Sequence, residues 1–307
     1  MGLVILLSVG IGWAILANIS KDEPIQNQNG TKKPVAWVFL NNSDVNARHW
    51  VDFMGRSSRV INLPFLNVCY ESIVKHTKQH YDIEVITGLA DLASRLGGWD
   101  KLPEPMRNPD TFVREPELNW IRAAVLKKFG GLWISPSTIW LNDMPECHKD
   151  KVMFFGTNTE DTYSTNNSVP ALDVIWSPKP EHPVWVEWEK TVKERLNFRT
   201  GGSEFRHDER KDFAETVRKF PKDIQVLRIP EISRKESPRK RIQLEDILAS
   251  SGGIDAAFDI PDKGLYLPIP LAELLQREQF GWFLRMSEDQ ILDSDLVISH
   301  LLRKAIK

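Results

Sequence analysis

The fold is decided by the stretch EPELNWIRAAVLKKFGGLWISPSTIWL, which runs from Glu115 to Leu141. Its first half predicts a helix, because Pro116 suits a first helical turn and the flanking acids Glu115 and Glu117 complement the positive end of the helix dipole. Apolar residues then recur at helical spacing. The positions that carry this period are Leu118, Ile121, Val125 and Phe129.

The second half of the stretch predicts a tight turn followed by a buried strand. Gly130 or Gly131 supplies the left-handed conformation that commonly ends a helix. The run Leu132–Leu141 is rich in Trp, Ile and Thr, the residue types favoured in buried strands. We therefore expect helix, turn and one strand in succession.

This frame resembles the DxD-containing glycosyltransferases of the Och-type mannosyltransferase and capsular polysaccharide synthesis group. In that group an Asp followed three positions later by an Arg lies on the helix, and Asp-x-Asp lies on the strand after Gly-Gly. Here Asn119 takes the place of the helix Asp, Arg122 matches the Arg, and Ser135-Pro136-Ser137 takes the place of DxD.

The resemblance implies a GT-A-like fold and a donor site built on these residues. It implies that Asn119 binds donor-sugar hydroxyls, that Arg122 contacts the sugar or diphosphate, and that Ser135 and Ser137 line the same site. Without the family, Asn119 and Arg122 are ordinary helix residues on one face, and the two serines are polar strand positions beside a proline.

The replacement of DxD bears directly on the use of a metal. Family members hold Mn²⁺ or Mg²⁺ through the two carboxylates, whereas a serine hydroxyl is a neutral and weaker ligand for such cations. The departing diphosphate still develops negative charge that needs stabilising. Three readings follow: neutralisation by Arg and Lys, a carboxylate recruited from elsewhere, or a homologue without catalysis.

The remaining chain alternates strand-like and helix-like runs, which predicts an α/β fold with a mostly parallel sheet and helices on both faces. The expected strands are Val35–Leu40, Asp82–Thr87, Val152–Gly156 and Leu172–Ser177, and the expected helices are Leu66–His80, Leu89–Leu96, Val184–Leu196 and Asp295–Ile306. Ligands of such sheets bind beyond the carboxyl ends of the strands. Asn41, Asn42 and Asp44 follow the first strand, so they are candidate nucleotide or acceptor contacts, with an exposed polar turn as the alternative.

Three further side chains are candidate contacts. His182 lies in a strand-to-helix segment, Ser177–Pro183, that also resembles the family, although a His beside Pro at a helix start is commonly structural. Trp133 belongs to a group of tryptophans whose faces suit sugar C–H surfaces or the core. In the group that this chain resembles, a C-terminal loop often closes over the donor, so the resemblance makes His300 and the nearby acids candidates for replacing the missing DxD ligands. The acids considered with it are Asp289, Asp293 and Asp295.

Composition narrows the class of protein. The chain has 307 residues, a formal charge of −2 and two cysteines, Cys69 and Cys147. A near-neutral charge argues against general nucleic-acid binding. Two cysteines indicate neither a disulfide framework nor a zinc site. No P-loop, GxSxG, HExxH or dinucleotide fingerprint is present.

The N-terminus predicts a membrane anchor. The alternative is a cleaved signal peptide, which normally has a positive n-region that this sequence lacks apart from the amino terminus. Residues 1–20 carry no charged side chain and 3–19 are almost wholly apolar, close to the length of a spanning helix. Residues 21–33 read as a stem and residues 34–307 as the glycosyltransferase-like domain. Lysines after the span favour a cytoplasmic domain, whereas family precedent in eukaryotes favours the secretory lumen, which we expect.

Taken from sequence, the expected activity is transfer of a hexose from a nucleotide diphosphate sugar to a glycan or similar acceptor. The family resemblance implies retention of anomeric configuration and does not identify a catalytic base. The alternative is a catalytically inactive protein on the same fold that binds glycans or nucleotide sugars.

Overall fold

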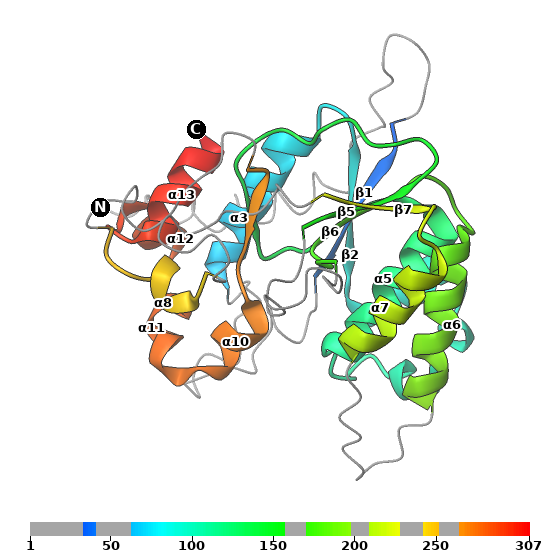
Figure 1. The fold of residues 1–307 in the computed structure, drawn as a ribbon. Coiled ribbons are helices and arrows are strands. Elements are labelled where there is room, and N and C mark those ends of the chain that lie inside the picture. The colour runs from blue at the N-terminus through cyan, green and yellow to red at the C-terminus, as the bar shows by residue number, and fades with distance from the viewer. Residues whose placement is uncertain (1–32, 41–62, 157–169, 198–208, 228–241, 252–263) are drawn as a thin grey trace, which may run out of the picture. The chain divides into compact units, whose positions relative to one another are not determined.

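The architecture comes from a computed structural model. It describes residues 33–40, 63–156, 170–197, 209–227, 242–251 and 264–307. The chain divides into two units, Met1–Pro34 and Val35–Lys307. The helices and strands labelled in Figure 1 all lie in the second unit.

A six-stranded sheet forms the centre of this unit. Its order is β2-β1-β3-β6-β5-β7, and β6 runs antiparallel to both of its neighbours while the other strands share one direction. The strands are β1 (Val35–Leu40), β2 (Asp82–Thr87), β3 (Gly131–Ile134), β5 (Val152–Phe155), β6 (Val174–Ser177) and β7 (Ile224–Leu227). The predicted α/β class and mostly parallel sheet are confirmed, and this arrangement is consistent with a GT-A-like fold.

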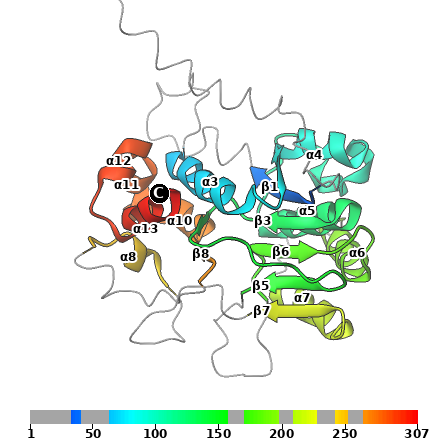
Figure 2. The same ribbon diagram turned by 90° about the horizontal axis from the view of Figure 1, so that it is seen from above.

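One face of the sheet is covered by four helices. They are α4 (Gly88–Leu96), α5 (Glu115–Phe129), α6 (Pro183–Asn197) and α7 (Glu209–Lys219). Figure 2 shows them together on one side of the strands. Trp37, Trp133 and Phe154 project from the sheet into the core beneath these helices. Alternate residues on each strand must point to opposite faces, so the neighbours of these side chains fill the other core.

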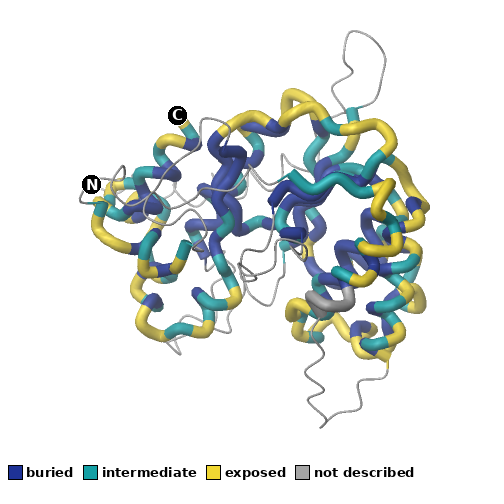
Figure 3. Tube along the Cα trace, viewed as in Figure 1, coloured by how far each residue is buried: buried dark blue, intermediate teal, exposed yellow. Residues whose placement is uncertain are grey.

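The opposite face is covered by α3 (Pro64–Thr77) and by a two-stranded ribbon. The ribbon pairs β4 (Thr138–Trp140) with β8 (Tyr266–Pro268), and Ile73, Trp140 and Tyr266 pack on the sheet. A further apolar cluster joins α3 to the C-terminal helices, along which buried dark blue and exposed yellow stretches alternate in Figure 3. These helices are α8 (Leu244–Ile247), α10 (Leu271–Gln276), α11 (Gly281–Leu284), α12 (Glu288–Asp293) and α13 (Val297–Ile306). Short 3₁₀ segments occupy Trp99–Lys101, Glu104–Met106 and Glu278–Phe280.

The prediction of one strand over Leu132–Leu141 was wrong. The structure divides it into β3, which belongs to the large sheet, and β4, which pairs with β8 in the ribbon. Pro136 at the break has no backbone N–H to donate to a neighbouring strand, so the ladder ends there. The chain therefore changes sheets at Ser135-Pro136-Ser137.

The predicted anchor lies outside the described residues, as do most of the stem and the residues Asn41, Asn42 and Asp44. Among the helices in the described ranges, none combines the length and the apolar character that a membrane crossing needs. The anchor and the lumenal location stay predictions.

Candidate functional site

Helix α5 begins where the sequence predicts and is fixed at both ends. The backbone N–H of Arg114 donates to the Glu117 carboxylate at 2.9 Å, which closes the first turn. At the other end Gly130 and Gly131 both have positive φ, 65° and 90°, as expected for the turn into β3. The middle is tied to α6, since Trp120 Nε1 donates to Glu189 at 2.9 Å.

The tight turn makes α5 antiparallel to β3 and sets the height of Arg122. Arg122 lies seven residues before Phe129, about 10 Å along the helix axis. Three residues of strand from Gly131 to Ile134 also span about 10 Å. Arg122 is therefore level with the carboxyl end of β3, the edge where sheets of this class bind ligands.

Arg122 is buried but keeps its charge partner at the surface. Its Nη1 donates to Asn119 Oδ1 at 2.7 Å and to Glu115 Oε1 at 2.6 Å. The Arg122 side chain is 6% exposed and that of Glu115 is 58% exposed. Asn119 is also buried, and its amide oxygen holds the guanidinium in place. The predicted pairing of Asn119 with Arg122 on one helix face is present.

One N–H of Arg122 and one of the adjacent Trp133 have no acceptor among the described residues. The Arg122 guanidinium lies 5.9 Å from the centre of the Trp133 ring. Arg122 Nε and Trp133 Nε1 are buried nitrogens without a hydrogen-bond partner, and no other buried side-chain nitrogen or oxygen of the described residues shares that state. Because an unpaired buried donor costs about 1–3 kcal/mol, two of them in one place mark a site short of an acceptor.

The triplet Ser135-Pro136-Ser137 follows β3, and neither of its two hydroxyls makes a hydrogen bond within the described residues. The Ser135 backbone N–H donates to Asp173 O at 2.7 Å, and the Ser135 carbonyl accepts from the Thr138 hydroxyl at 2.8 Å. The Ser137 carbonyl accepts from Ile269 N at 2.8 Å. Neither serine hydroxyl bonds to any residue in the described ranges. The backbone of the triplet thus builds the turn, and its side chains remain available to a ligand.

The first loop follows a strand adjacent to β3. Val38 of β1 pairs with Ile134, so the end of β1 at Leu40 adjoins the start of the triplet. The candidate contacts Asn41, Asn42 and Asp44 follow Leu40 and lie outside the described residues. Their role stays a prediction.

His182 lies at the other edge of the sheet. It follows β6, whose last residue Ser177 pairs with Gly131 at the amino end of β3. The ring Nδ1 accepts the Val184 N–H at 3.4 Å at the start of α6. Burial lowers the pKa of His182, and Lys179 adds to this while Asp223 opposes it. The structure does not bring His182 to the serine triplet; it places the ring at a helix start.

His300 lies on α13 among C-terminal polar residues. Its Nε2 contacts Asp295 at 3.0 Å, and Asp295 also accepts from the Ser251 hydroxyl at 2.6 Å. The hydrogen bond with His300, and after it the one from Ser251, holds the pKa of Asp295 below its usual range. The group ties α13 to the segment after α8.

The described residues do not fit a hard divalent cation. No set of three or more His, Cys, Asp or Glu side chains gathers among them in a geometry able to hold a metal. At the DxD position Ser135 and Ser137 offer neutral oxygens, and Glu115 is already paired with Arg122. We derive no step through a metal ion.

The tryptophans near the motif serve the core. Five of the six are at most 2% exposed, and Trp133 is the one that adjoins Arg122. The five are Trp120, Trp133, Trp140, Trp185 and Trp188. Large aromatics stabilise a core through the area they bury, which explains this use.

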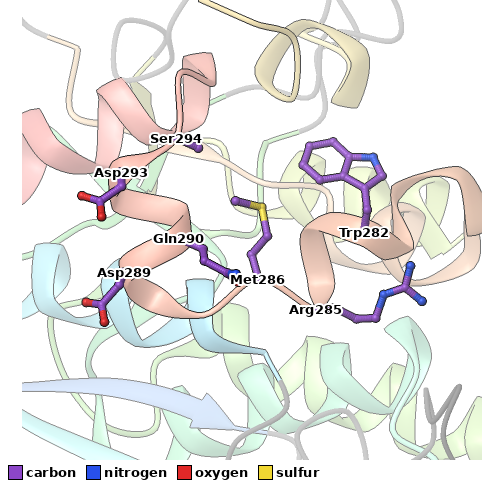
Figure 4. Close-up of a pocket in the computed structure, with 7 residues that line it drawn as sticks. All are labelled: Trp282, Arg285, Met286, Asp289, Gln290, Asp293 and Ser294. Atoms are coloured by element: carbon purple, nitrogen blue, oxygen red, sulfur yellow. The ribbon is translucent and has the colours of Figure 1, made fainter.

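An exposed tryptophan lies elsewhere, on α11. Trp282 is 41% exposed and lines an open hollow of about 640 Å³ with side chains of α11 and α12. Figure 4 shows Met286 and Gln290 beneath it, with the carboxylates of Asp289 and Asp293 turned away from the indole.

Glu115 is the site residue that the sequence analysis missed. It was assigned to the helix dipole, yet it lies seven residues before Arg122, two full turns along the same face. Arginine side chains in helices lean toward the N-terminus, so this spacing was a usable signal.

The chain shows only low similarity to known proteins. Neither the protein-family models nor the curated protein sequences match the chain. Among solved structures, the glycosyltransferase GlyE from Streptococcus pneumoniae TIGR4 aligns with a TM-score of 0.39 and 8% identity, over 90% of this chain and 61% of that one. A transferase with two cysteine-to-serine substitutions aligns with a TM-score of 0.32 and 11% identity, over 62% of this chain and 88% of that one. Likeness at this level identifies neither an activity nor a site.

Proposed function

We propose that this protein is a glycosyltransferase that moves a hexose from a nucleotide diphosphate sugar to a glycan or similar acceptor hydroxyl. The observation that carries the proposal is the buried Arg122 guanidinium, level with the carboxyl end of β3, whose Nε–H and the neighbouring Trp133 Nε1–H have no acceptor among the described residues. A diphosphate supplies oxygen acceptors for these donors and a negative charge for the guanidinium.

In the proposed reaction the acceptor hydroxyl oxygen forms a bond to the anomeric carbon. The old bond from that carbon to the diphosphate breaks, and its electron pair stays on the diphosphate oxygen, which takes the hydroxyl proton. Attack on the face that the diphosphate leaves retains the anomeric configuration. Arg122 binds the diphosphate and stabilises the charge that develops on it, while Asn119 positions the guanidinium.

The Ser135 and Ser137 hydroxyls complete the proposed donor site. Both are unbonded within the described residues and follow the strand whose Trp133 lies against Arg122. Hydroxyls donate to phosphate oxygens or accept from sugar hydroxyls without adding charge. Their role is to orient the donor, and the stabilising positive charge comes from Arg122.

The proposal is tested by donor turnover. The full chain is incubated with UDP- and GDP-hexoses, with and without Mn²⁺, and release of the nucleotide diphosphate is measured. We expect turnover of at least one donor and loss of about 10- to 100-fold in kcat/KM on Arg122→Gln, since hydrogen bonds to a charged group contribute about 1.5–3 kcal/mol.

A second candidate function is binding without catalysis on the same fold. The neutral triplet Ser135-Pro136-Ser137 favours it, because no carboxylate stands at the DxD position. Tight binding of a nucleotide sugar with no turnover across the donor panel would establish this function and overturn the transferase proposal.

A further inference from the structure

The ion pair between Arg122 and Glu115 joins two very differently placed side chains. The guanidinium is 6% exposed and is fixed by Asn119, whereas the carboxylate is 58% exposed on the first turn of α5. The contact is short, with 2.6 Å between Arg122 Nη1 and Glu115 Oε1. The Arg122 cation is therefore fixed inside the protein, whereas the Glu115 anion lies at the surface.

The energetics of the two partners differ in the same way. Glu115 is largely hydrated already, so the carboxylate itself loses little by turning into water, provided that another anion takes its place on Arg122. A buried cation without any counter-charge costs several kcal/mol. Arg122 thus requires an anion, but not this particular anion.

We propose that Glu115 occupies, in the ligand-free protein, the position on Arg122 that the donor diphosphate takes, and that it thereby sets the anion specificity of the site. This inference rests on the proposed function of Arg122 as the diphosphate-binding residue. When the diphosphate binds, Glu115 turns outward from the first helical turn and Arg122 exchanges one anionic partner for another. No covalent bond changes in this exchange.

The exchange selects for highly charged ligands. A carboxylate tethered two helical turns away has an effective concentration in the millimolar range or above, so a free monoanion of equal charge cannot displace it. A diphosphate carries more charge and offers several oxygens to the guanidinium fork, including its unpaired Nε–H, and to the neighbouring Trp133 Nε1–H. The site therefore admits diphosphates and rejects simple carboxylates.

Calorimetric titration with inorganic pyrophosphate and with acetate tests this role, using the full chain in EDTA. The variant is Glu115→Gln, which keeps an oxygen for Arg122 and removes the competing charge. Glu84→Gln is the matched control, because Glu84 pairs with Arg95 at 3.1 Å on the β2 and α4 side and is 47% exposed. Both variants change the net charge equally.

We expect Glu115→Gln to bind pyrophosphate about fivefold more tightly than the wild type, with measurable acetate binding appearing only in this variant. Glu84→Gln should match the wild type within about twofold by the same arithmetic. In an Arg122→Gln background, Glu115→Gln should no longer change the affinity, which a purely structural role of Glu115 would not predict. Melting temperatures confirm that each variant is folded.

The outcomes separate the inference from the function beneath it. If the wild type turns over a donor through Arg122 but Glu115→Gln gains no pyrophosphate affinity, the role of Glu115 is overturned while the function stands. If neither protein binds pyrophosphate and no donor is turned over, both proposals fail. An equal gain in Glu84→Gln would reduce the effect to net charge and overturn the inference.

Discussion

Arg122 concentrates the chemistry of this protein in one side chain. Its guanidinium contacts Asn119 and Glu115, lies on the Trp133 ring, and retains a buried Nε–H without an acceptor. A planar fork of donors suits an anion with several oxygens better than a point charge does. The geometry of the cation, and not its charge alone, should therefore determine donor binding.

Replacement of Arg122 by lysine tests this point. Arg122→Lys keeps the charge but loses the planar fork and its contact with the ring, so we expect a rise in the Kd for UDP or GDP of about tenfold or more. Titration calorimetry measures the change. Lys127→Arg, on the surface of the same helix, is the matched control and should bind as the wild type does. Retention of full affinity in Arg122→Lys would mean that only the charge matters.

At the scale of elements, the glycine turn that returns α5 to β3 positions Arg122. Gly131 lets β3 leave the turn pressed against β1, since a Cβ there would lie 2.4 Å from Val35 O. Trp37 Nε1 completes the corner by donating to Gly130 O at 2.9 Å. Small shifts here would move the helix relative to the strand that carries the triplet.

We predict that Gly131→Ala destabilises the protein by about 2 kcal/mol or more, because it combines a positive φ with a steric clash against backbone. Gly281→Ala is the control, since a Cβ there meets nothing within 4 Å. It should be neutral or slightly stabilising. Urea unfolding measures both, and equal stability of the two variants would contradict this account of the turn.

The pH dependence of stability should report His182 at the start of α6. Burial holds the pKa of His182 in the folded protein below the usual value of 6.5. At pH values between this folded pKa and 6.5, the unfolded chain therefore binds more protons than the folded protein does. The stability contributed by the neutral, buried His182 is fully present above pH 6.5 and is lost as the pH falls through the folded pKa. His182→Asn keeps a side-chain acceptor at the helix start and should flatten the fall in Tm between pH 7 and pH 5.

An exposed histidine provides the control for that experiment. His80→Asn replaces an exposed ring, and the variant should show the same dependence of Tm on pH as the wild type. A wild-type Tm that does not fall below pH 6.5, or a His182→Asn profile that is no flatter, would contradict the assignment.

The elements also show where sequence reasoning succeeds. The bounds of β1 and β2 match the expected runs, because both runs are rich in the apolar and β-branched residues that strands favour. The expected strand Leu132–Leu141 was wrong, because Trp140 pairs with Tyr266 from a distant segment that no local pattern reveals. Likewise Asn119 and Arg122 share a face as their spacing predicts. The burial that makes Glu115 their surface partner depends on packing against the sheet.

At the scale of the whole described unit, the C-terminal helices stabilise the face opposite α5. Helix α13 packs on α3, with Leu301 and Leu302 fully buried in their shared cluster. Lys75 Nζ donates to Ala305 O at 3.0 Å, and His76 contacts the same carbonyl at 3.2 Å. Since α3 also covers the sheet, the end of the chain supports the strands that carry the site.

We expect Leu301→Ala to reduce the free energy of unfolding by about 2–5 kcal/mol through loss of buried area and the cavity that remains. Lys304→Ala, on the exposed face of α13, should change it by less than about 0.5 kcal/mol. Thermal and urea unfolding followed by circular dichroism compare them. A small effect of Leu301→Ala would show that α13 is not integral to the core.

The central claim, that Arg122 binds the diphosphate of a nucleotide sugar, is tested most directly by a crystal structure with a UDP- or GDP-sugar bound. The account predicts diphosphate oxygens within hydrogen-bonding distance of the Arg122 guanidinium and Glu115 turned away from it. A nucleotide sugar bound elsewhere, with the Arg122–Glu115 pair intact, would contradict the claim.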